Sequence, residues 1–456
     1  MGPVASAGLR ARERVVVHVH APAARWISTL TLLSLFCWLI LMLFHDHREP
    51  EWVLTIFVAV AFIARGIFLG RPVTAAHAWM AMALLIAGFA ARVVFVDALG
   101  NAFMVAAGVA LMWPTAARPN PADLPKVWAL VNATTGDPVA PFAMQALKCH
   151  HFDSDATAAI AYRTRFGYAV VSGDPIGNEA QFPDLVRDFV TTCHAWGWRI
   201  VVLGCSERRL HLWSDVTVIG QTLHPVPIGR DVVIDVAAFD MAGRRFRNLR
   251  QAVQRTGNAG ITTEIVAEQG LDPDLLAELA EVLLTSPSGS RMERGFSMIL
   301  DGALEGRYPG IQLIIARDEQ GRVQGFHRYA TAGRGAEITL DVPWRRRGAP
   351  NGIDERLTVD MINSAKQQGA LRVSLAFAAF PEIFDDANRG RIRSLFYTAI
   401  HLGDALIALE SLYRYLRKFH ALGDRRYVLL SLTQVVPLLV VLLSLEFMPR
   451  RRHLTG

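Results

Sequence analysis

The run Trp26–Phe44, WISTLTLLSLFCWLILMLF, constrains the architecture most, because it contains no charged residue. Its length is close to the ~20 apolar residues that an α-helix needs to cross a bilayer. The polar stretch His45–Pro50 follows it, and no small-residue cleavage site lies between them. We therefore interpret this run as a membrane anchor and not as a cleaved signal peptide.

Three further apolar segments precede residue 114. They are Trp52–Leu69, which carries Arg65, Ala76–Val96, which carries Arg92, and the shorter Ala98–Trp113. Basic residues precede the first span, separate the second from the third, and follow the fourth. The positive-inside rule then places the N-terminus and the rest of the chain in the cytoplasm. We predict a cytoplasmic segment 1–25 and about four transmembrane helices within 26–113.

A further candidate membrane segment is Tyr427–Phe447, which is long enough to span and has arginines on both sides. Such flanks suit either a spanning helix or a helix that lies at an anionic interface. We favour a fifth membrane segment over residues 427–447. The sequence thus predicts a multi-pass protein of the cell membrane with a cytoplasmic domain.

Composition agrees with a chain that is part membrane-bound and part soluble. Charged residues make up 19% of the 456 residues, below the roughly 25% of ordinary soluble domains. The formal charge of +6 favours anionic partners such as nucleic acid or anionic lipid. The four cysteines lie far apart without a CxxC pair, so neither a zinc site nor a disulfide framework is indicated.

The globular part follows a Pro-rich linker within residues 114–126. Its clearest unit is a strand at Glu337–Val342, a loop, a helix over about 352–368 and a strand at Leu371–Phe377, for which a right-handed crossover is the default geometry. Other expected strands are Ile200–Gly204, Val216–Ile219, Val232–Val236, Ile311–Ala316 and Val323–Ala330, and other expected helices are Pro183–Trp196, Leu271–Leu284 and Ala405–Arg417. The pattern predicts an α+β fold.

Arginines gather at two places in this part. Residues 244–255, RRFRNLRQAVQR, contain five arginines and no acidic residue, and Arg345–Arg347 lie in the loop before the predicted helix, between Asp341 and Asp354. A charge run is usually a solvated face, and the aspartates can simply pair with nearby arginines. A purely cationic helix nevertheless favours an anionic surface, and guanidinium forks suit phosphate.

Several common catalytic motifs are absent: G-x-S-x-G, the Walker A loop, HExxH and a GxGxxG after a strand. The paired histidines have no third partner at metal-ligand spacing. Cationic segments together with a membrane tether fit a transferase that takes an activated group from a nucleic acid and gives it to a lipid.

Motifs in a fixed order resemble the aminoacyl-transferase domain of bacterial lysylphosphatidylglycerol synthases, the multiple peptide resistance factor family. The first is LKCHHF…AAIAYRTRFGYAVVSGDPIG, in which Lys148, Phe152, Tyr162 and Asp174 match. The others lie at Arg247–Gly260, Glu293–Phe296, Asp341–Asp354, Lys366–Leu375 and Tyr413–Phe419. The resemblance covers roughly residues 126–430.

The resemblance implies a tandem acetyltransferase-like (GNAT-like) fold, with lobes at 127–240 and 241–426. It also implies transfer of an aminoacyl group, lysyl or alanyl, from aminoacyl-tRNA to phosphatidylglycerol, which alters membrane charge and resistance to cationic peptides. Because the ester is already activated, no metal or redox cofactor is required. Charged tRNA is expected to come from a separate synthetase.

The site residues are assigned on this resemblance. The catalytic candidates are Asp341, Asp354, Arg345 and Glu293, with either aspartate as the base or as the group that orients the lipid hydroxyl. The substrate-binding candidates are Arg346, Lys366, Ser374, Asp174 and Lys418. The tRNA-binding candidates are Arg244, Arg245, Arg247, Arg250 and Arg255.

The chain departs from the family pattern in two ways. At most four spans precede the domain, where typical members carry a long flippase, and Ala376 and Phe377 replace the Gly of the usual SLG motif and the residue after it. Two alternatives therefore stay open. One is transfer to another acceptor, such as diacylglycerol, an ornithine lipid or a peptidoglycan precursor. The other is a non-catalytic membrane-tethered protein that binds RNA or anionic lipid.

Overall fold

The computed structural model describes residues 15–17, 22–45, 50–94, 97–286, 299–379 and 414–447. The chain divides into two compact units. Unit 1 comprises Met1–Arg118, Arg163–Val170 and Arg187–Ile200, and unit 2 comprises Pro119–Tyr162, Val171–Val186 and Val201–Gly456.

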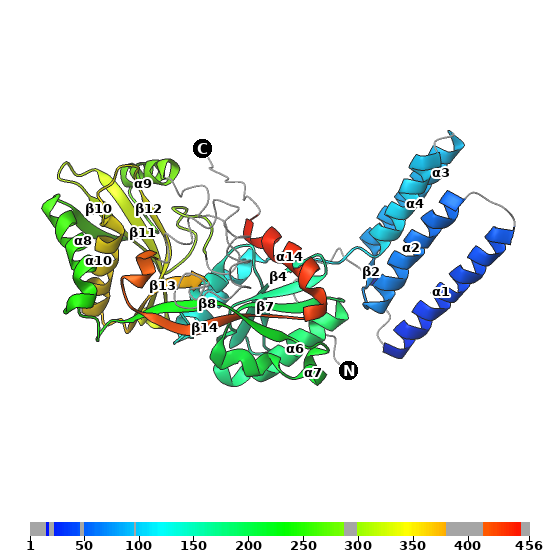
Figure 1. Cartoon of the computed structure of the whole chain (residues 1–456), viewed down its shortest axis with the longest axis horizontal. Helices are drawn as coiled ribbons and strands as arrows, with labels where there is room; N and C mark the ends of the chain where they lie inside the picture. The colour runs from blue at the N-terminus through cyan, green and yellow to red at the C-terminus, as the bar shows by residue number, and fades with distance from the viewer. Residues whose placement is uncertain are drawn as a thin grey trace. The chain divides into compact units, whose positions relative to one another are not determined.

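Four apolar helices make up most of unit 1 (Figure 1). They are α1 (Pro22–His45), α2 (Pro50–Phe68), α3 (Ala75–Val93) and α4 (Asp97–Leu111), and a short pair of strands, β1 (Val15–Val17) and β2 (Val73–Thr74), accompanies them. A Cβ on Gly108 would lie 3.0 Å from the Cα of Ala59, and one on Gly88 would lie 3.2 Å from the carbonyl oxygen of Gly100. Close approach at small residues is typical of helices that pack within a membrane.

The expected membrane spans are supported only in part. Within the described ranges, one helix, Ala75–Val93, is long and apolar enough to cross a membrane by length and composition. The other apolar stretches are shorter: Ala23–Trp38, Leu54–Phe68 and Asp97–Leu111. A multi-pass arrangement is therefore not supported by the helix lengths.

Twelve strands form one mixed sheet. Their order is β3 (Cys149–Phe152), β4 (Ala158–Arg165), β5 (Tyr168–Ser172), β7 (Arg199–Ser206), β14 (Leu422–Leu430), β8 (His224–Asp235), β13 (Arg372–Ala379), β12 (Glu337–Arg345), β11 (Val323–Ala332), β10 (Ile311–Arg317) and β9 (Thr262–Ala267), with β6 (Ile176–Gly177) paired to β4. The α+β class with a large mixed sheet is confirmed.

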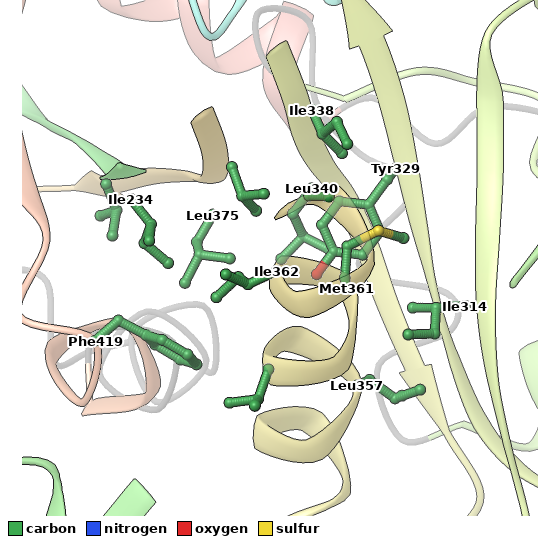
Figure 2. Close-up of a cluster of buried hydrophobic side chains, with 14 of the residues drawn as sticks. Ile234, Ile314, Tyr329, Ile338, Leu340, Leu357, Met361, Ile362, Leu375 and Phe419 are labelled. Carbon is green, nitrogen blue, oxygen red and sulfur yellow. The ribbon is translucent and has the colours of Figure 1, made fainter. Parts of the chain in front are cut away.

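The predicted strand–helix–strand unit is present as β12, α10 (Ile353–Gln367) and β13, and its two strands pair in parallel. Leu357, Met361 and Ile362 of α10 pack against sheet residues that include Tyr329 and Leu340 (Figure 2). The apolar positions of the helix fall on one face because they recur at the helical period. This core fixes the helix, and with it the residues of its first turn.

Most of the other expected elements are present. The remaining helices are α5 (Leu124–Ala133), α6 (Phe182–Ala195), α7 (Val216–Ile219), α8 (Arg247–Asn258), α9 (Pro273–Thr285) and α14 (Val435–Phe447). The strand expected at Val216–Ile219 is wrong, because this segment is a single helical turn. Asp215 caps its N-terminus by accepting from Thr217 N–H, and Gly220 ends it at a φ of 71°. Of the helix expected at Ala405–Arg417, residues 405–413 lie outside the described part.

The segment Tyr427–Phe447, expected to be a membrane-spanning or interfacial helix, is not a single helix. Residues up to Leu430 belong to β14, which pairs antiparallel with β7 on one side and β8 on the other. The helix that follows, α14, has 13 residues, fewer than the ~20 that a span requires. The apolar run at Tyr427–Leu430 marks a central strand that is buried on both faces, a pattern that hydropathy alone does not separate from a membrane segment.

Candidate functional site

Asp354 lies in the first turn of α10, next to residues of two neighbouring strands. Its Oδ1 is 3.2 Å from Nε2 of His327 on β11, and its Oδ2 is 3.4 Å from Nη1 of Arg345, the last residue of β12. Gly352 precedes the helix at a φ of 103°, and a Cβ there would lie 3.0 Å from the backbone oxygen of Ala252. Only glycine tolerates both conditions, so the sequence fixes where α10 begins.

Access and charge distinguish the three side chains of this site. His327 is fully buried, whereas Asp354 is 24% exposed and Arg345 is 48% exposed. Burial tends to raise the pKa of Asp354, but contact with His327 and the charges of Arg345 and Lys418 hold that pKa below its usual value. Asp354 is therefore an ionised carboxylate that solvent can reach, supported from behind by a buried histidine.

Lys418 reaches the same region, where it pairs with Glu355, the residue after Asp354. Tyr415 and Thr358 share a hydrogen bond nearby, and burial raises the pKa of Tyr415 well above its usual value. Asp354 and Arg345 were predicted from one motif and Lys418 from another, and the structure brings the three side chains together.

Asp341 lies in a different setting, inside the sheet. Its Oδ2 accepts from Arg328 Nη1 at 2.8 Å and its Oδ1 accepts from the N–H of Leu300 at 2.8 Å. Arg328 also donates to Glu268 at 2.8 Å, and all three side chains are fully buried. Burial raises the pKa of Asp341 to about 6, against the opposing effect of Arg328. Both oxygens of Asp341 are engaged, as the simple pairing alternative anticipated, although the partner is Arg328 and not an arginine of the loop.

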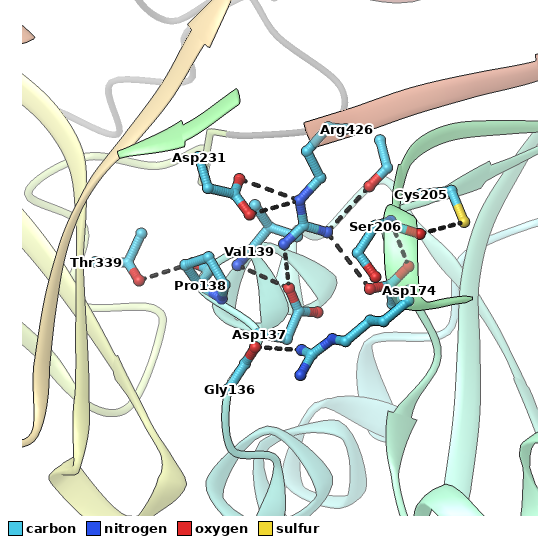
Figure 3. A network of polar contacts seen from close by, with 12 residues as sticks. Gly136, Asp137, Pro138, Val139, Asp174, Cys205, Ser206, Asp231, Thr339 and Arg426 are labelled. Carbon is cyan, nitrogen blue, oxygen red and sulfur yellow. Dashed lines mark hydrogen bonds and ion pairs between the residues drawn. The ribbon is translucent and has the colours of Figure 1, made fainter. Parts of the chain in front are cut away.

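Asp174 belongs to a buried cluster around Arg426 of β14 (Figure 3). The Arg426 guanidinium donates to Asp231 at 2.9 and 3.0 Å and to Asp137 at 2.7 Å, and it lies 3.5 Å from Asp174. One cation thus faces three carboxylates out of contact with water. Burial raises the pKa of Asp174 and raises that of Asp231 to about 6, despite Arg426. This arrangement joins four segments of unit 2 and leaves Asp174 inaccessible to a substrate.

The other predicted binding residues are dispersed. Arg346 holds both oxygens of Glu281 and donates Nε to the carbonyl of Val323. Lys366 is exposed and lies 3.5 Å from the Ala237 carbonyl, whereas Ser374 is buried within β13. Glu293 lies outside the described residues.

The five arginines at residues 244–255 form a helical segment with exposed side chains, as expected. Arg244 and Arg245 lie in a single turn that leads into α8, which contains Arg247, Arg250 and Arg255. Leu249 and Ala252 hold the opposite side of the helix in the core. Within the described chain none of the five arginines makes an ion pair with a carboxylate, so the segment presents uncompensated positive charge.

Sequence reasoning missed His327, Arg328 and Arg426. Each is a buried polar residue whose partners lie in other elements, so no local pattern marks it. The available signal was a charged residue next to a strand-like apolar run, such as Arg426 before YVLL. In the described ranges no group of three or more His, Cys, Asp or Glu side chains is arranged to hold a metal ion.

A family model described as phosphatidylglycerol lysyltransferase, C-terminal, matches residues 128–430. The chain belongs to this family. It is 66% identical over 454 residues to the MprF-like domain protein of Mycobacterium tuberculosis, and the aligned region covers 98% of this chain and 94% of that protein. It is 29% identical over 310 residues to the lysylphosphatidylglycerol biosynthesis bifunctional protein LysX of Gordonia bronchialis, covering 66% of this chain and 26% of LysX.

Solved structures share the fold of this phosphatidylglycerol lysyltransferase family member. L-PGS of Bacillus licheniformis matches with a TM-score of 0.58 and 21% identity, covering 73% of this chain and 98% of that one. The C-terminal domain of an Agrobacterium fabrum protein assigned as a lysylphosphatidylglycerol synthetase gives a TM-score of 0.60 and 22% identity, covering 73% and 100%. The predicted family is thus confirmed, and the division into two acetyltransferase-like lobes stays a prediction.

Proposed function

We propose that the chain is a membrane-anchored aminoacyltransferase that moves a lysyl or alanyl group from aminoacyl-tRNA to phosphatidylglycerol. The observation that carries the proposal is membership of the phosphatidylglycerol lysyltransferase family over residues 128–430. The cationic segment 244–255 supplies a surface suited to the tRNA backbone, and the apolar helices of unit 1 supply the membrane attachment. We place the domain on the cytoplasmic side, where charged tRNA is found.

The reaction exchanges one ester for another. The lipid hydroxyl oxygen attacks the aminoacyl carbonyl carbon, the bond from that carbon to the ribose oxygen of tRNA breaks, and the hydroxyl proton ends on the ribose oxygen. The protein must hold the two reactants together, guide the proton and stabilise the oxyanion. All three tasks are within reach of side chains alone.

Access favours Asp354 over Asp341 as the carboxylate that meets substrate. The pKa of Asp341, about 6, is the better match to a general base, but its two oxygens are already engaged by Arg328 and by the N–H of Leu300. Geometry takes precedence over pKa when a catalytic group is assigned. Asp354 is partly exposed and ionised, so it accepts the hydrogen bond of the incoming hydroxyl and orients it, while buried His327 fixes the carboxylate from behind.

Arg345 completes the proposed site, because its guanidinium lies beside Asp354 and is half exposed. A guanidinium fork binds a phosphate through two parallel hydrogen bonds. We assign Arg345 to the phosphate of the lipid or of the tRNA 3′ end. Lys418, beside Glu355, adds positive charge to the same place.

The test is lipid extraction from cells that express the full chain, with mass spectrometry for aminoacylated lipids. We expect aminoacyl-phosphatidylglycerol with the intact chain and at least a hundredfold less with Asp354→Asn, since positioned acid–base groups contribute about 10²–10⁴ in rate. Asp360→Asn is the matched control, because Asp360 lies on the same helix and pairs with Arg356 away from the site.

Each outcome decides between the alternatives. An aminoacylated lipid other than phosphatidylglycerol would replace the acceptor and keep the reaction. Product from a folded Asp354→Asn variant would remove Asp354 from the site. If a folded, membrane-bound chain supplied with charged tRNA makes no new lipid, the alternative of a non-catalytic binding protein is favoured. The hydrogen bonds that occupy both oxygens of Asp341 fit that alternative.

A further inference from the structure

Arginines from separate segments of unit 1 converge at one end of the apolar helices. Arg65 lies in the last turn of α2, and Arg71 follows in the connection to α3. Arg199, the first residue of β7, comes from far along the chain, and its N–H donates to the carbonyl of Gly167 at 2.9 Å. The Arg71 side chain also lies against Gly167, so Arg71 and Arg199 both contact this glycine.

The Arg71 guanidinium is held in a fixed position. Its Nη1 donates to the Met112 carbonyl at 3.0 Å, at the end of α4. A Cβ on Gly167 would lie 3.0 Å from Nη2, and one on Gly197 would lie 3.0 Å from the Arg71 backbone. Both glycines have positive φ, 81° and 63°, so glycine is required there on steric and conformational grounds. The fold is therefore built to accept this arginine.

The three arginines of this cluster act on one another electrostatically. Burial lowers the pKa of Arg71, and the positive charges of Arg65 and Arg199 lower it further. In the part of the chain that the structure describes, none of these three arginines makes an ion pair with a carboxylate. Like charges held close together favour an anion between them.

Aromatic side chains at the same helix ends indicate what kind of anion this is. Trp26 and Phe68, from α1 and α2, pack edge to face with centroids 4.8 Å apart. Trp113, just after α4, is 49% exposed, and Phe166, beside Gly167, is 47% exposed. Exposed aromatic rings at the ends of apolar helices mark the level of the membrane surface. A nucleic acid does not require them.

We propose that Arg65, Arg71 and Arg199 form a binding site for the phosphodiester of an anionic phospholipid at the membrane surface. The arginines take the phosphate oxygens, and Trp113 and Phe166 enter the acyl boundary beside it. A lipid bound there anchors the 163–170 and 187–200 segments of unit 1 at the bilayer. This inference rests on the membrane location proposed above.

The test uses the full chain in neutral detergent and measures its melting temperature as phosphatidylglycerol or phosphatidylcholine is added. We expect phosphatidylglycerol alone to stabilise the chain at low concentration. The double variant Arg65→Gln/Arg199→Gln is expected to bind phosphatidylglycerol about 30-fold more weakly, from the typical contribution of two arginines at an anionic surface. It leaves Arg71, with its bond to Met112, in place to support the fold.

The matched control is Arg322→Gln/Arg334→Gln, which removes two exposed arginines of unit 2 and is expected to keep wild-type lipid affinity. Equal weakening in both double variants would reduce the effect to net charge and overturn the site. Equal stabilisation by soluble glycerophosphate would make it a site for free phosphate, and a selective loss of tRNA binding would make it a nucleic-acid site.

The lipid-extraction assay distinguishes this inference from the proposed function. The wild-type chain could make aminoacylated lipid while the Arg65→Gln/Arg199→Gln variant binds phosphatidylglycerol as tightly as wild type. That result would overturn the headgroup site and leave the transferase in place. Selective phosphatidylglycerol binding without any aminoacylated lipid would overturn the transferase alone.

Discussion

At the residue scale, two buried clusters each contain more carboxylates than cations, whereas Asp354 lies in a partly exposed and more positive setting. Arg426 faces three aspartates and Arg328 faces Asp341 and Glu268, so both clusters carry excess negative charge out of contact with water. Burial of unbalanced charge is expensive, and it raises the pKa of Asp174, Asp231 and Asp341. Asp354, which contacts Arg345 and His327 and is partly open to solvent, shows the opposite shift. Solvent access and local charge together separate structural carboxylates from the candidate for substrate contact.

Stability is expected to fall as the pH rises from about 4 to about 6. The pKa of Asp231 is about 6 in the folded chain and about 3.9 when unfolded. In this window the folded state holds a proton at Asp231 that the unfolded state has released, so raising the pH favours unfolding, and Asp231 alone contributes about 3 kcal/mol. Melting temperatures between pH 4 and pH 7 check this.

Asp231→Asn is expected to remove the share of that pH dependence that Asp231 contributes, because the amide cannot release a proton. Asp235→Asn is the control, since Asp235 ends the same strand but is exposed. A pH profile of Asp231→Asn that matches wild type would show that another group, such as Asp341, accounts for the slope.

Arg328→Ala is expected to lower the free energy of unfolding by about 3–5 kcal/mol, because it leaves Asp341 and Glu268 buried without a cation. Arg346→Ala is the matched comparison: its partner Glu281 is exposed, and exposed pairs contribute roughly 0–1 kcal/mol. Denaturant titration of both variants gives the difference. Similar losses in the two variants would contradict the buried triad.

At the element scale, local patterns predicted the elements whose periodicity is carried by neighbouring residues. The parallel unit β12–α10–β13 and helices α6 and α9 follow from apolar spacing and turn residues alone. The strand β14 did not, because an uninterrupted apolar run describes a membrane helix and a central strand equally well. Its place between β7 and β8 depends on residues about 200 positions earlier, such as Asp231, that no local window contains.

The candidate site shows the same division between local and distant information. Asp354 and Arg345 were found because their motif leads into one helix, and Lys418 was found through the closing motif of the family resemblance. His327 was missed because its partner is 27 residues away on another element. Asp174 was identified as a motif residue, but only the fold shows that it is bonded within the Arg426 cluster.

The cationic segment ending in α8 is expected to bind tRNA through phosphates. Arg247→Gln and Arg255→Gln should each weaken binding to all tRNAs alike, and each should reduce the slope of log affinity against log salt by about 0.9 for a duplex contact. Filter binding over a salt series measures this. Arg322→Gln, which removes an exposed arginine paired with Asp318, should leave the slope unchanged. An unchanged slope in the α8 variants would assign these arginines to another partner.

At the scale of the whole molecule, the strand nearest the C-terminus closes the centre of the sheet. β14 supplies Arg426 to Asp137, Asp174 and Asp231, which come from three other segments of unit 2 (Figure 3). Removal of β14 therefore removes a central strand and leaves three buried carboxylates without their cation. The helix α14 has no such role, although Leu438, Val441 and Leu445 are buried.

Truncation separates these contributions. A chain that ends at residue 434 is expected to keep a protease-resistant folded core with a somewhat lower melting temperature, whereas a chain that ends at residue 420 is expected to be degraded. Arg426→Ala in the full chain should reproduce much of the second effect, because breaking a buried ion pair costs about 3–5 kcal/mol. If the chain ending at residue 420 folded as well as that ending at 434, β14 would be dispensable, and residues 427–447 would again be open to assignment as a membrane segment.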